Sequence, residues 1–119
     1  MALSPQEIKN QLSNFTGTQN WHKFNGGLLL TDGIKHLAEI CQCYWLLDII
    51  SSVQTLPAIK PESFQVYTLN KTGENSAKLF ASDGDENLLY QQEIPSTDFP
   101  LESISIWLVD GVILLPTEY

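Results

Sequence analysis

The longest stretch with helical periodicity runs from Thr31 to Gln54. With about 100° of rotation per residue, a helix over this stretch has one mostly apolar face, a stripe that includes a single acidic residue. The members of this stripe are Ile34, Leu37, Ala38, Cys41, Trp45, Asp48, Ile49 and Ser52. The second half is apolar on the opposite face as well, which is typical of a helix buried on most sides. We therefore expect a central helix over about residues 32–54. Weaker helix formers at Cys41–Cys43 leave open whether it is continuous or broken there.

A shorter helix is predicted before the central one. Ser4-Pro5-Gln6-Glu7 has the residues of a helix start, with an N-cap serine, a proline at the first position and a glutamate that completes a capping box. The apolar spacing that follows predicts a helix over about residues 5–14. We expect residues 19–27 to form a loop that carries Trp21 and Phe24 inward, and Leu28–Leu30 to form a short apolar approach to the central helix, with a short strand as the alternative.

From Phe64 onward the apolar period is two, which indicates β-strands. The predicted strands are 64–70, 77–82, 88–94, 104–109 and 112–115. Short turns between successive strands favour an antiparallel meander. Helices that come first and strands that follow, without alternation, predict an α+β fold with the helices packed on about five strands.

Asp110-Gly111 is a strong signal for a two-residue hairpin loop. It pairs Val109 with Val112, and the register then continues through three more pairs: Leu108 with Ile113, Trp107 with Leu114, and Ile106 with Leu115. Because side chains alternate between faces, we assign one set to the core under the helices: Ile104, Ile106, Leu108, Ile113 and Leu115. The other set is also apolar: Trp107, Val109, Val112 and Leu114.

An apolar set on the far face of a two-layer domain needs a cover. The sequence leaves three candidates open: the N-terminal helix, the connector around Pro57–Pro61, and another molecule. A two-fold dimer is the commonest way for a second molecule to supply such a cover. These four residues are therefore the candidate interface, and we expect the protein to be a homodimer if the chain itself does not cover them.

The charge balance excludes some partners. The chain has six basic residues, all lysines, against fourteen acidic ones, for a net charge of -8. Nucleic-acid recognition depends on cations and especially on the arginine fork, so an acidic chain without arginine is not expected to bind DNA or RNA. Anionic membrane surfaces are disfavoured for the same reason.

The 119 residues are enough for a single domain, 1–119, with one core. The start of the chain has neither the basic nor the apolar region of a signal peptide, and no apolar run is long enough to span a membrane. Cys41 and Cys43 would point roughly 200° apart on a helix, which does not allow an ordinary disulfide. We expect reduced thiols and a cytoplasmic location.

Several segments resemble a family of small bacterial proteins of unknown function. They are FTGT at residues 15–18, LLLTDGIKHLAE at 28–39, YWLLDIISS at 44–52 and QEIPSTDFPLESISIWLVDGVILLPTEY at 92–119. The resemblance covers nearly the whole chain and implies a bacterial, cytosolic, single-domain protein whose relatives occur on chromosomes and mobile elements. It implies no activity, cofactor or catalytic residue. Where relatives tend to have small residues, this chain has Cys41 and Cys43.

Three residues are the only candidates for catalysis. Asp48 lies within the apolar stripe, where an ionised carboxylate is costly unless it is paired, so it is either a general acid or base or a buried acceptor that holds the Trp21 loop to the helix. His22 and His36 are the only histidines. Nothing in the sequence sets their distances from Asp48. The spacing of Cys41 and Cys43 matches no zinc pattern, so we expect neither a metal nor another cofactor.

The sequence therefore supports three functional hypotheses. The first is a small binding or protein-interaction module that self-associates. The second is an enzyme with a small pocket near Asp48 and the Trp21 loop. The third, suggested by the charge and by the mobile-element relatives, is an acidic protein that occupies a basic surface of a partner.

Overall fold

The computed structural model describes residues 3–119. Met1 and Ala2, the start of the predicted domain and of the segment inspected for a signal peptide, lie outside the described residues. The helices are α1 (Pro5–Leu12), α2 (Asp32–Ile40) and α3 (Tyr44–Ser52), with short 3-10 turns η1 (Asn25–Gly27), η2 (Val53–Thr55) and η3 (Pro116–Glu118). The strands are β1 (Trp21–Lys23), β2 (Leu29–Thr31), β3 (Phe64–Lys71), β4 (Ala77–Ser82), β5 (Leu88–Ile94), β6 (Ser103–Val109) and β7 (Val112–Leu114). The predicted α+β class is confirmed. No helix within residues 3–119 is long and apolar enough to cross a membrane.

The strands form one seven-stranded sheet in the order β1-β2-β7-β6-β3-β4-β5. All neighbours are antiparallel except β2 and β7, which run parallel. The predicted sheet of five strands was too small, because β1 and β2 extend it beyond β7. Each of these strands has only three residues, which is too short to show a period of two. The predicted meander holds from β3 to β5, and β6 then returns to the other side of β3.

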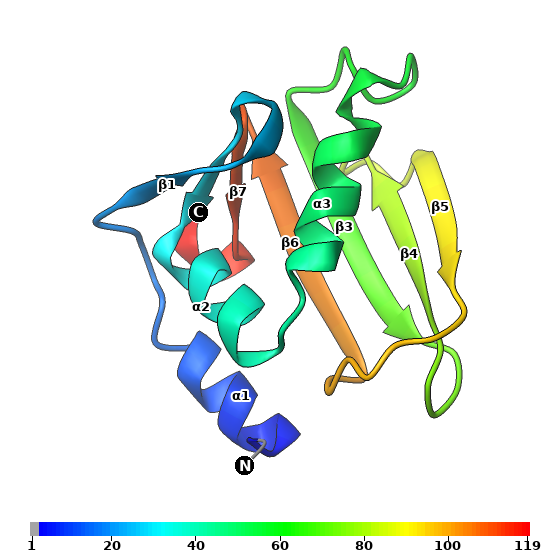
Figure 1. The fold of residues 1–119 in the computed structure, drawn as a ribbon. Helices are drawn as coiled ribbons and strands as arrows, with labels where there is room; N and C mark the ends of the chain where they lie inside the picture. The colour runs from blue at the N-terminus through cyan, green and yellow to red at the C-terminus, as the bar shows by residue number, and fades with distance from the viewer. Residues whose placement is uncertain (1–2) are drawn as a thin grey trace.

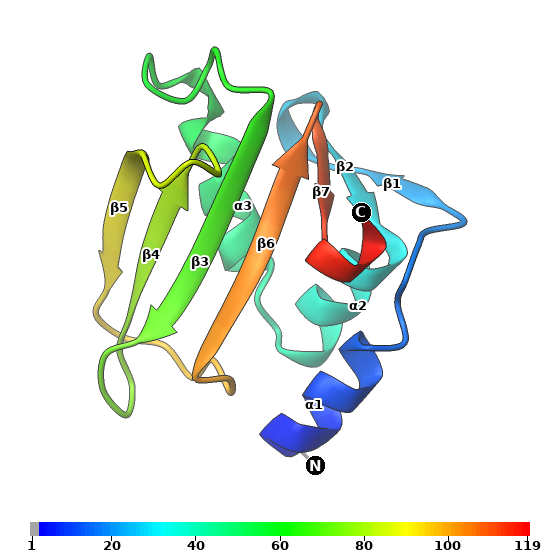
Figure 2. The same cartoon turned by 180° about the vertical axis from the view of Figure 1, so that it is seen from behind.

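The helices occupy one side of the sheet (Figure 1). α3 crosses over the middle strands, and α2 lies over β7 and the adjoining end of β6. The opposite side of the sheet is seen directly in Figure 2, where the C-terminal turn η3 lies in front of α2. Between the layers lies a core whose largest fully buried side chains include Ile34, Leu37, Leu47, Ile50, Tyr67, Leu69 and Ile106.

The central helix predicted over about 32–54 is broken near Cys41–Cys43, which was one of the two alternatives that the sequence left open. α2 ends at Ile40, Gln42 has a left-handed φ of 50°, and α3 begins at Tyr44. The three residues between the helices shift the helical phase. An unbroken helix would have buried Trp45, Asp48 and Ile49, whereas α3 buries Leu46, Leu47 and Ile50. Asp48 is consequently exposed, so the prediction that it is buried was wrong.

The C-terminal hairpin has the predicted register. Trp107 pairs with Leu114, Leu108 with Ile113, and Val109 with Val112. Asp110 and Gly111 both have positive φ, 49° and 83°, as a two-residue hairpin loop with the matching twist requires. The fourth predicted pair, Ile106 with Leu115, does not form because β7 ends at Leu114. Four of the five predicted core residues of this hairpin are buried, namely Ile106, Leu108, Ile113 and Leu115, and Ile104 is partly buried.

Candidate functional site

A carboxylate from the end of the chain caps α2. Thr31 is the N-cap residue, and its hydroxyl donates to Glu118 Oε1 at 2.6 Å. The other oxygen of the same carboxylate, Oε2, accepts the backbone N–H of Gly33 at 3.1 Å. The N–H of Leu115 donates to Oε1 at 3.0 Å, which closes the turn that carries Glu118. A negative charge at a helix N-terminus is favourable, so this contact holds the C-terminal turn onto the helix layer.

On the other side of the same helix start lies a histidine–carboxylate pair. His22 Nε2 is 2.9 Å from Asp32 Oδ1, and both side chains are partly exposed. Asp32 Oδ2 accepts the backbone N–H groups of Gln19 and Asn20 at 3.1 and 3.3 Å. The hydrogen bond from His22, followed by that from the Gln19 N–H, lowers the pKa of the Asp32 carboxyl. The pair therefore ties β1 and the loop before it to α2.

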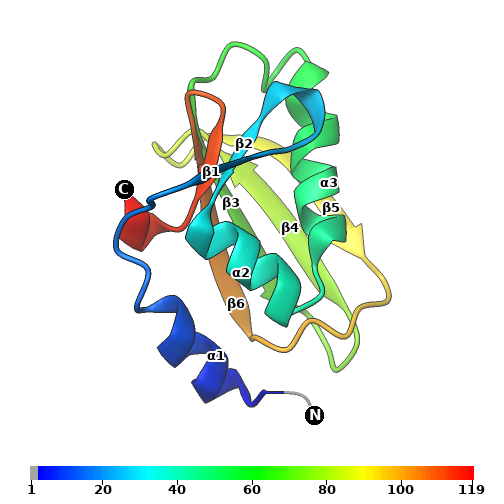
Figure 3. The same cartoon turned by 60° about the vertical axis from the view of Figure 1, so that its left-hand side comes forward.

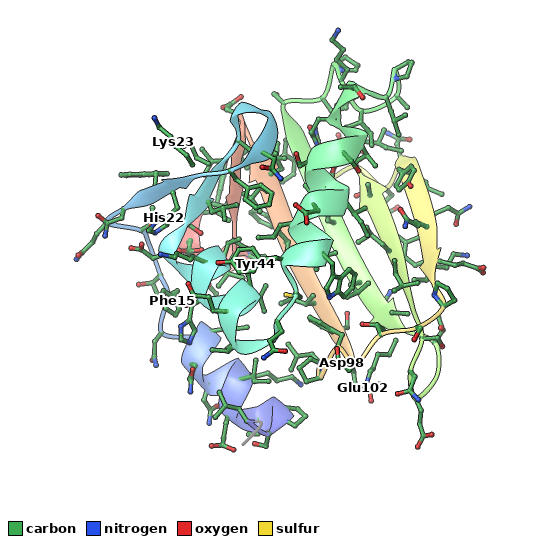
Figure 4. All side chains as sticks on the ribbon, in the orientation of Figure 1. Phe15, His22, Lys23, Tyr44, Asp98 and Glu102 are labelled. Carbon is green, nitrogen blue, oxygen red and sulfur yellow. The ribbon has the colours of Figure 1, made fainter. Side chains whose placement is uncertain are left out.

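The other two candidate residues have partners of their own. His36 Nε2 is 2.7 Å from Gln11 Oε1, and its ring lies 5.2 Å from that of Phe15, so it joins α2 to the end of α1. Asp48 accepts a hydrogen bond from Asn25 Nδ2 at 3.1 Å at the protein surface. This contact joins η1, after β1, to α3, but Asp48 makes it as an exposed residue and to the side chain of Asn25, not as the buried acceptor that the sequence interpretation described. His22 and Phe15 lie on the flank of the molecule formed by β1, α1 and α2, away from α3 (Figure 4).

The two cysteines lie at the break between α2 and α3. Both are free and buried, and the Cys43 thiol donates to the carbonyl of Leu37 at 3.7 Å. Because Gln42 turns the chain, the thiols are near enough to interact, which the geometry of an unbroken helix would not allow. Hydrogen bonding with Cys43 lowers the pKa of the Cys41 thiol, and the same interaction, with burial, raises the pKa of Cys43. Cys41 lines a hollow of about 470 Å³ together with Ile8 and Asp98.

No metal-binding cluster accompanies these groups. Among the described residues, no three His, Cys, Asp or Glu side chains are gathered closely enough to hold an ion. The most buried polar cluster is Gln54, Gln65 and Tyr67 at the end of α3. Gln54 Nε2 donates to Tyr67 Oη at 2.8 Å, and Gln65 Nε2 donates to Gln54 Oε1 at 3.0 Å. Burial raises the pKa of Tyr67 to about 12. Because its polar groups are hydrogen-bonded to one another, we interpret this cluster as a structural part of the core.

The side of the sheet away from α2 and α3, which we call the outer face, is apolar at one end. Strand register places a continuous set of side chains on it: Phe64, Val66, Thr68 and Asn70 from β3, Ser103, Ser105, Trp107 and Val109 from β6, and Val112 and Leu114 from β7. None of these side chains is charged, although the chain has a net charge of -8, whereas β4 and β5 add Lys78 and Glu93 to the same side of the sheet. These uncharged side chains lie on the three neighbouring strands β7, β6 and β3, whose outer side is turned to the viewer in Figure 2.

Three aromatic rings meet on this face. The Trp107 ring lies 5.3 Å from that of Phe64 and 5.4 Å from that of Tyr119, both edge-on. The C-terminal residue therefore supplies part of the cover, which none of the three sequence-based candidates included. Tyr119 is itself 70% exposed, and among the predicted interface residues only Leu114 is buried, whereas Trp107, Val109 and Val112 are partly exposed.

Sequence reasoning missed Phe64 and Tyr119 as members of this cluster. The period of two in β3 places Phe64 on the same face as Val66, but only the strand order puts that face beside Trp107. Tyr119 follows Pro116 and lies outside any strand pattern, so no local signal identified it.

The comparisons with known proteins give a family and nothing further. Residues 6–119 match the model of a family described as a family of unknown function (DUF6876). No curated protein and no solved structure matched the chain.

Proposed function

Because the chain belongs to the DUF6876 family, whose function is unknown, we propose a role on its geometry alone: it is a small protein-interaction module that associates with a second copy through the outer face. The observation that carries this proposal is the uncharged, aromatic surface around Trp107 in an otherwise acidic chain. Interfaces are depleted in charged residues at their centre and enriched in aromatic ones.

The uncharged patch on β3, β6 and β7 is compatible with a second copy as the occupant. Two chains of net charge -8 repel one another, but a contact centred on this patch would bury no unpaired charge. Burial of the Trp107, Phe64 and Tyr119 rings supplies the favourable term. A two-fold axis through the outer face would place the same patch on both sides of the contact.

The candidate catalytic residues favour interaction over catalysis. His22, His36 and Asp48 each bond to a separate partner and form no shared group. We take the protein to act in the cytoplasm, where the buried thiols of Cys41 and Cys43 stay reduced.

Analytical ultracentrifugation over a range of concentrations tests the proposal. We expect a dimer for the wild type and a folded monomer for Trp107→Glu, because a carboxylate at the centre of the contact would be buried without a partner. Tyr44→Glu is the matched control. Tyr44 is an exposed aromatic residue at the start of α3, on the helix side of the sheet (Figure 4), and its replacement should leave the dimer intact.

Circular dichroism of each variant separates loss of association from loss of fold. A wild-type chain that sediments as a monomer at about 1 mM would refute self-association, since a complex worth only about 4 kcal/mol is substantially formed at that concentration.

A further inference from the structure

Strand β6 has a free edge along half of its length. It pairs with β3 from Ser103 to Val109, but with β7 only from Trp107 to Val109. Beyond the end of β7 at Leu114, the same register would set Leu115 opposite Ile106 and Pro116 opposite Ser105. Proline has no N–H to donate to the sheet, so the chain leaves the strand and enters η3 instead.

The backbone groups on this free edge follow from the hairpin register. In a two-residue hairpin the residues next to the loop, Val109 and Val112, exchange backbone hydrogen bonds, and every second residue along the strand then faces the same way. The N–H and C=O groups of Ser105 and Ser103 therefore point away from β3, to the side that β7 has left. Within residues 3–119, no strand pairs with them on that side.

A groove of about 340 Å³ runs along this edge. Its lining residues come from three segments: Lys9, Leu12 and Ser13 of α1, Leu101, Ser103, Ile104 and Ser105 at the start of β6, and Leu115, Pro116 and Thr117 of the C-terminal turn. Most of its exposed surface is apolar, and Lys9 is the only charged residue in the lining. Figures 2 and 3 show α1 facing the half of β6 that β7 does not reach.

We propose that this groove binds an extended segment of a partner protein, which adds to the free edge of β6 as a short strand. The backbone of such a strand presents a donor and an acceptor at every second residue, about 6.6 Å apart, which matches the spacing of Ser103 and Ser105. Apolar side chains at alternate positions would lie against Leu12, Ile104 and Leu115. The length of the free edge limits the paired part to about three or four residues.

This binding site adjoins the outer face at Ser103 and Ser105 but rests on different groups from the contact proposed for the dimer. The groove is built on the backbone edge of β6 and on α1, whereas the dimer contact uses the side chains of Trp107, Phe64 and Tyr119. The two proposals can therefore fail independently.

The experiment uses a phage-displayed library of random twelve-residue peptides, selected on the full-length protein, with the best recovered peptide made synthetically. We expect recovered peptides to share apolar residues at alternate positions. In the free protein, the amide protons of Ser103 and Ser105 should exchange rapidly with solvent, whereas those of Ile104 and Ile106, which face β3, should exchange slowly. Bound peptide should slow exchange at Ser103 and Ser105 by at least about tenfold.

Changes to the peptide test the strand geometry without altering the protein. Methylation of the peptide nitrogens that face β6 should weaken binding by about tenfold for each hydrogen bond lost, whereas methylation of those that face away should have little effect. On the protein side, Leu12→Glu should weaken binding and Trp107→Glu should leave it unchanged, because Trp107 does not line the groove.

Three results would overturn the proposal. One is the recovery of no peptide above a selection without protein. Another is equal affinity for the two methylated peptides. The third is protection around Trp107 in place of Ser103 and Ser105, which would assign peptide binding to the outer face.

Discussion

The carboxylate of Glu118 occupies the space that a side chain at Gly33 would need. The Gly33 N–H donates to Glu118 Oε2 at 3.1 Å, and a Cβ at position 33 would lie 2.6 Å from Glu118 Oε1 and 2.8 Å from Leu115 Cδ1. The absence of a side chain at the second residue of α2 is therefore what allows the C-terminal turn to reach the helix start.

Gly33→Ala should destabilise the protein by about 1–2 kcal/mol. Alanine favours a helix over glycine by up to about 1 kcal/mol, but the added methyl group displaces Glu118 and leaves helix N–H groups without an acceptor. Urea denaturation measures the difference. Gly17→Ala is the control, since a Cβ there would meet nothing within 4 Å. Equal stability of Gly33→Ala and wild type would show that the Glu118 cap contributes little.

The stability of the protein should depend on Asp32 at acid pH. The hydrogen bond from His22 holds the pKa of Asp32 below its ordinary value in the folded chain, so the folded state binds the proton less readily than the unfolded state. The resulting stabilisation is complete above the unfolded-state pKa, about 3.9, and is lost as the pH falls through the lower folded-state pKa.

The free energy of unfolding of Asp32→Asn should therefore decrease less than that of the wild type as the pH falls from about 5 to about 3. Urea unfolding midpoints measured across this range follow the change. His22→Ala should flatten the same part of the curve, and the double variant should add little to either single change because the two residues act as a pair. Parallel stability curves for wild type and Asp32→Asn would contradict this account.

Cys41 should react with iodoacetamide before Cys43 does. Cys41 lines the hollow beside Ile8 and its pKa is lowered by Cys43, whereas Cys43 is fully buried with a raised pKa. Since the thiolate is the reactive form, we expect Cys41 to be alkylated at least about tenfold faster in the folded protein. Both cysteines lie on one tryptic peptide, so fragmentation of that peptide by tandem mass spectrometry gives the two rates, and in denaturant they should become similar. Faster alkylation of Cys43 in the folded protein would contradict the geometry of the helix break.

Gln42→Gly should stabilise the protein by about 0.5–1 kcal/mol. Gln42 is exposed and has a φ of 50°, a conformation that costs a side-chain-bearing residue roughly 1 kcal/mol and glycine almost nothing. Thermal or urea denaturation measures the gain. Glu39→Gly, also exposed but within α2, should instead cost about 1 kcal/mol. A loss of stability in both variants would indicate that residues 41–43 are helical in solution.

How much of this structure could be predicted depends on the range of the interactions involved. The pairing of Trp107 with Leu114 follows from Asp110-Gly111, because a two-residue loop leaves only one register. The strands from β3 to β6 follow from their period of two, β7 follows from the hairpin loop before it, and the start of α1 follows from its capping box. Each of these signals is contained in a few neighbouring residues.

The features that were mispredicted or missed depend on residues far apart in the chain. β2 is a strand because β1 and β7 pair with it on its two sides, and Glu118 caps α2 from a position 85 residues beyond Gly33. The exposure of Asp48 depends on how the turn at Gln42 sets α3 on the sheet, since an unbroken helical phase places the same residue in the core.

The sequence by itself thus determined the fold class, the C-terminal hairpin and the apolar character of the Trp107 side of that hairpin, because each depends on local geometry and side-chain alternation. Only the tertiary structure decided which neighbours share that face and where β6 is left without a partner. The neighbours on that face and the free edge of β6 both depend on the strand order. That order is set by which segments, distant in the sequence, pair with each other in the sheet.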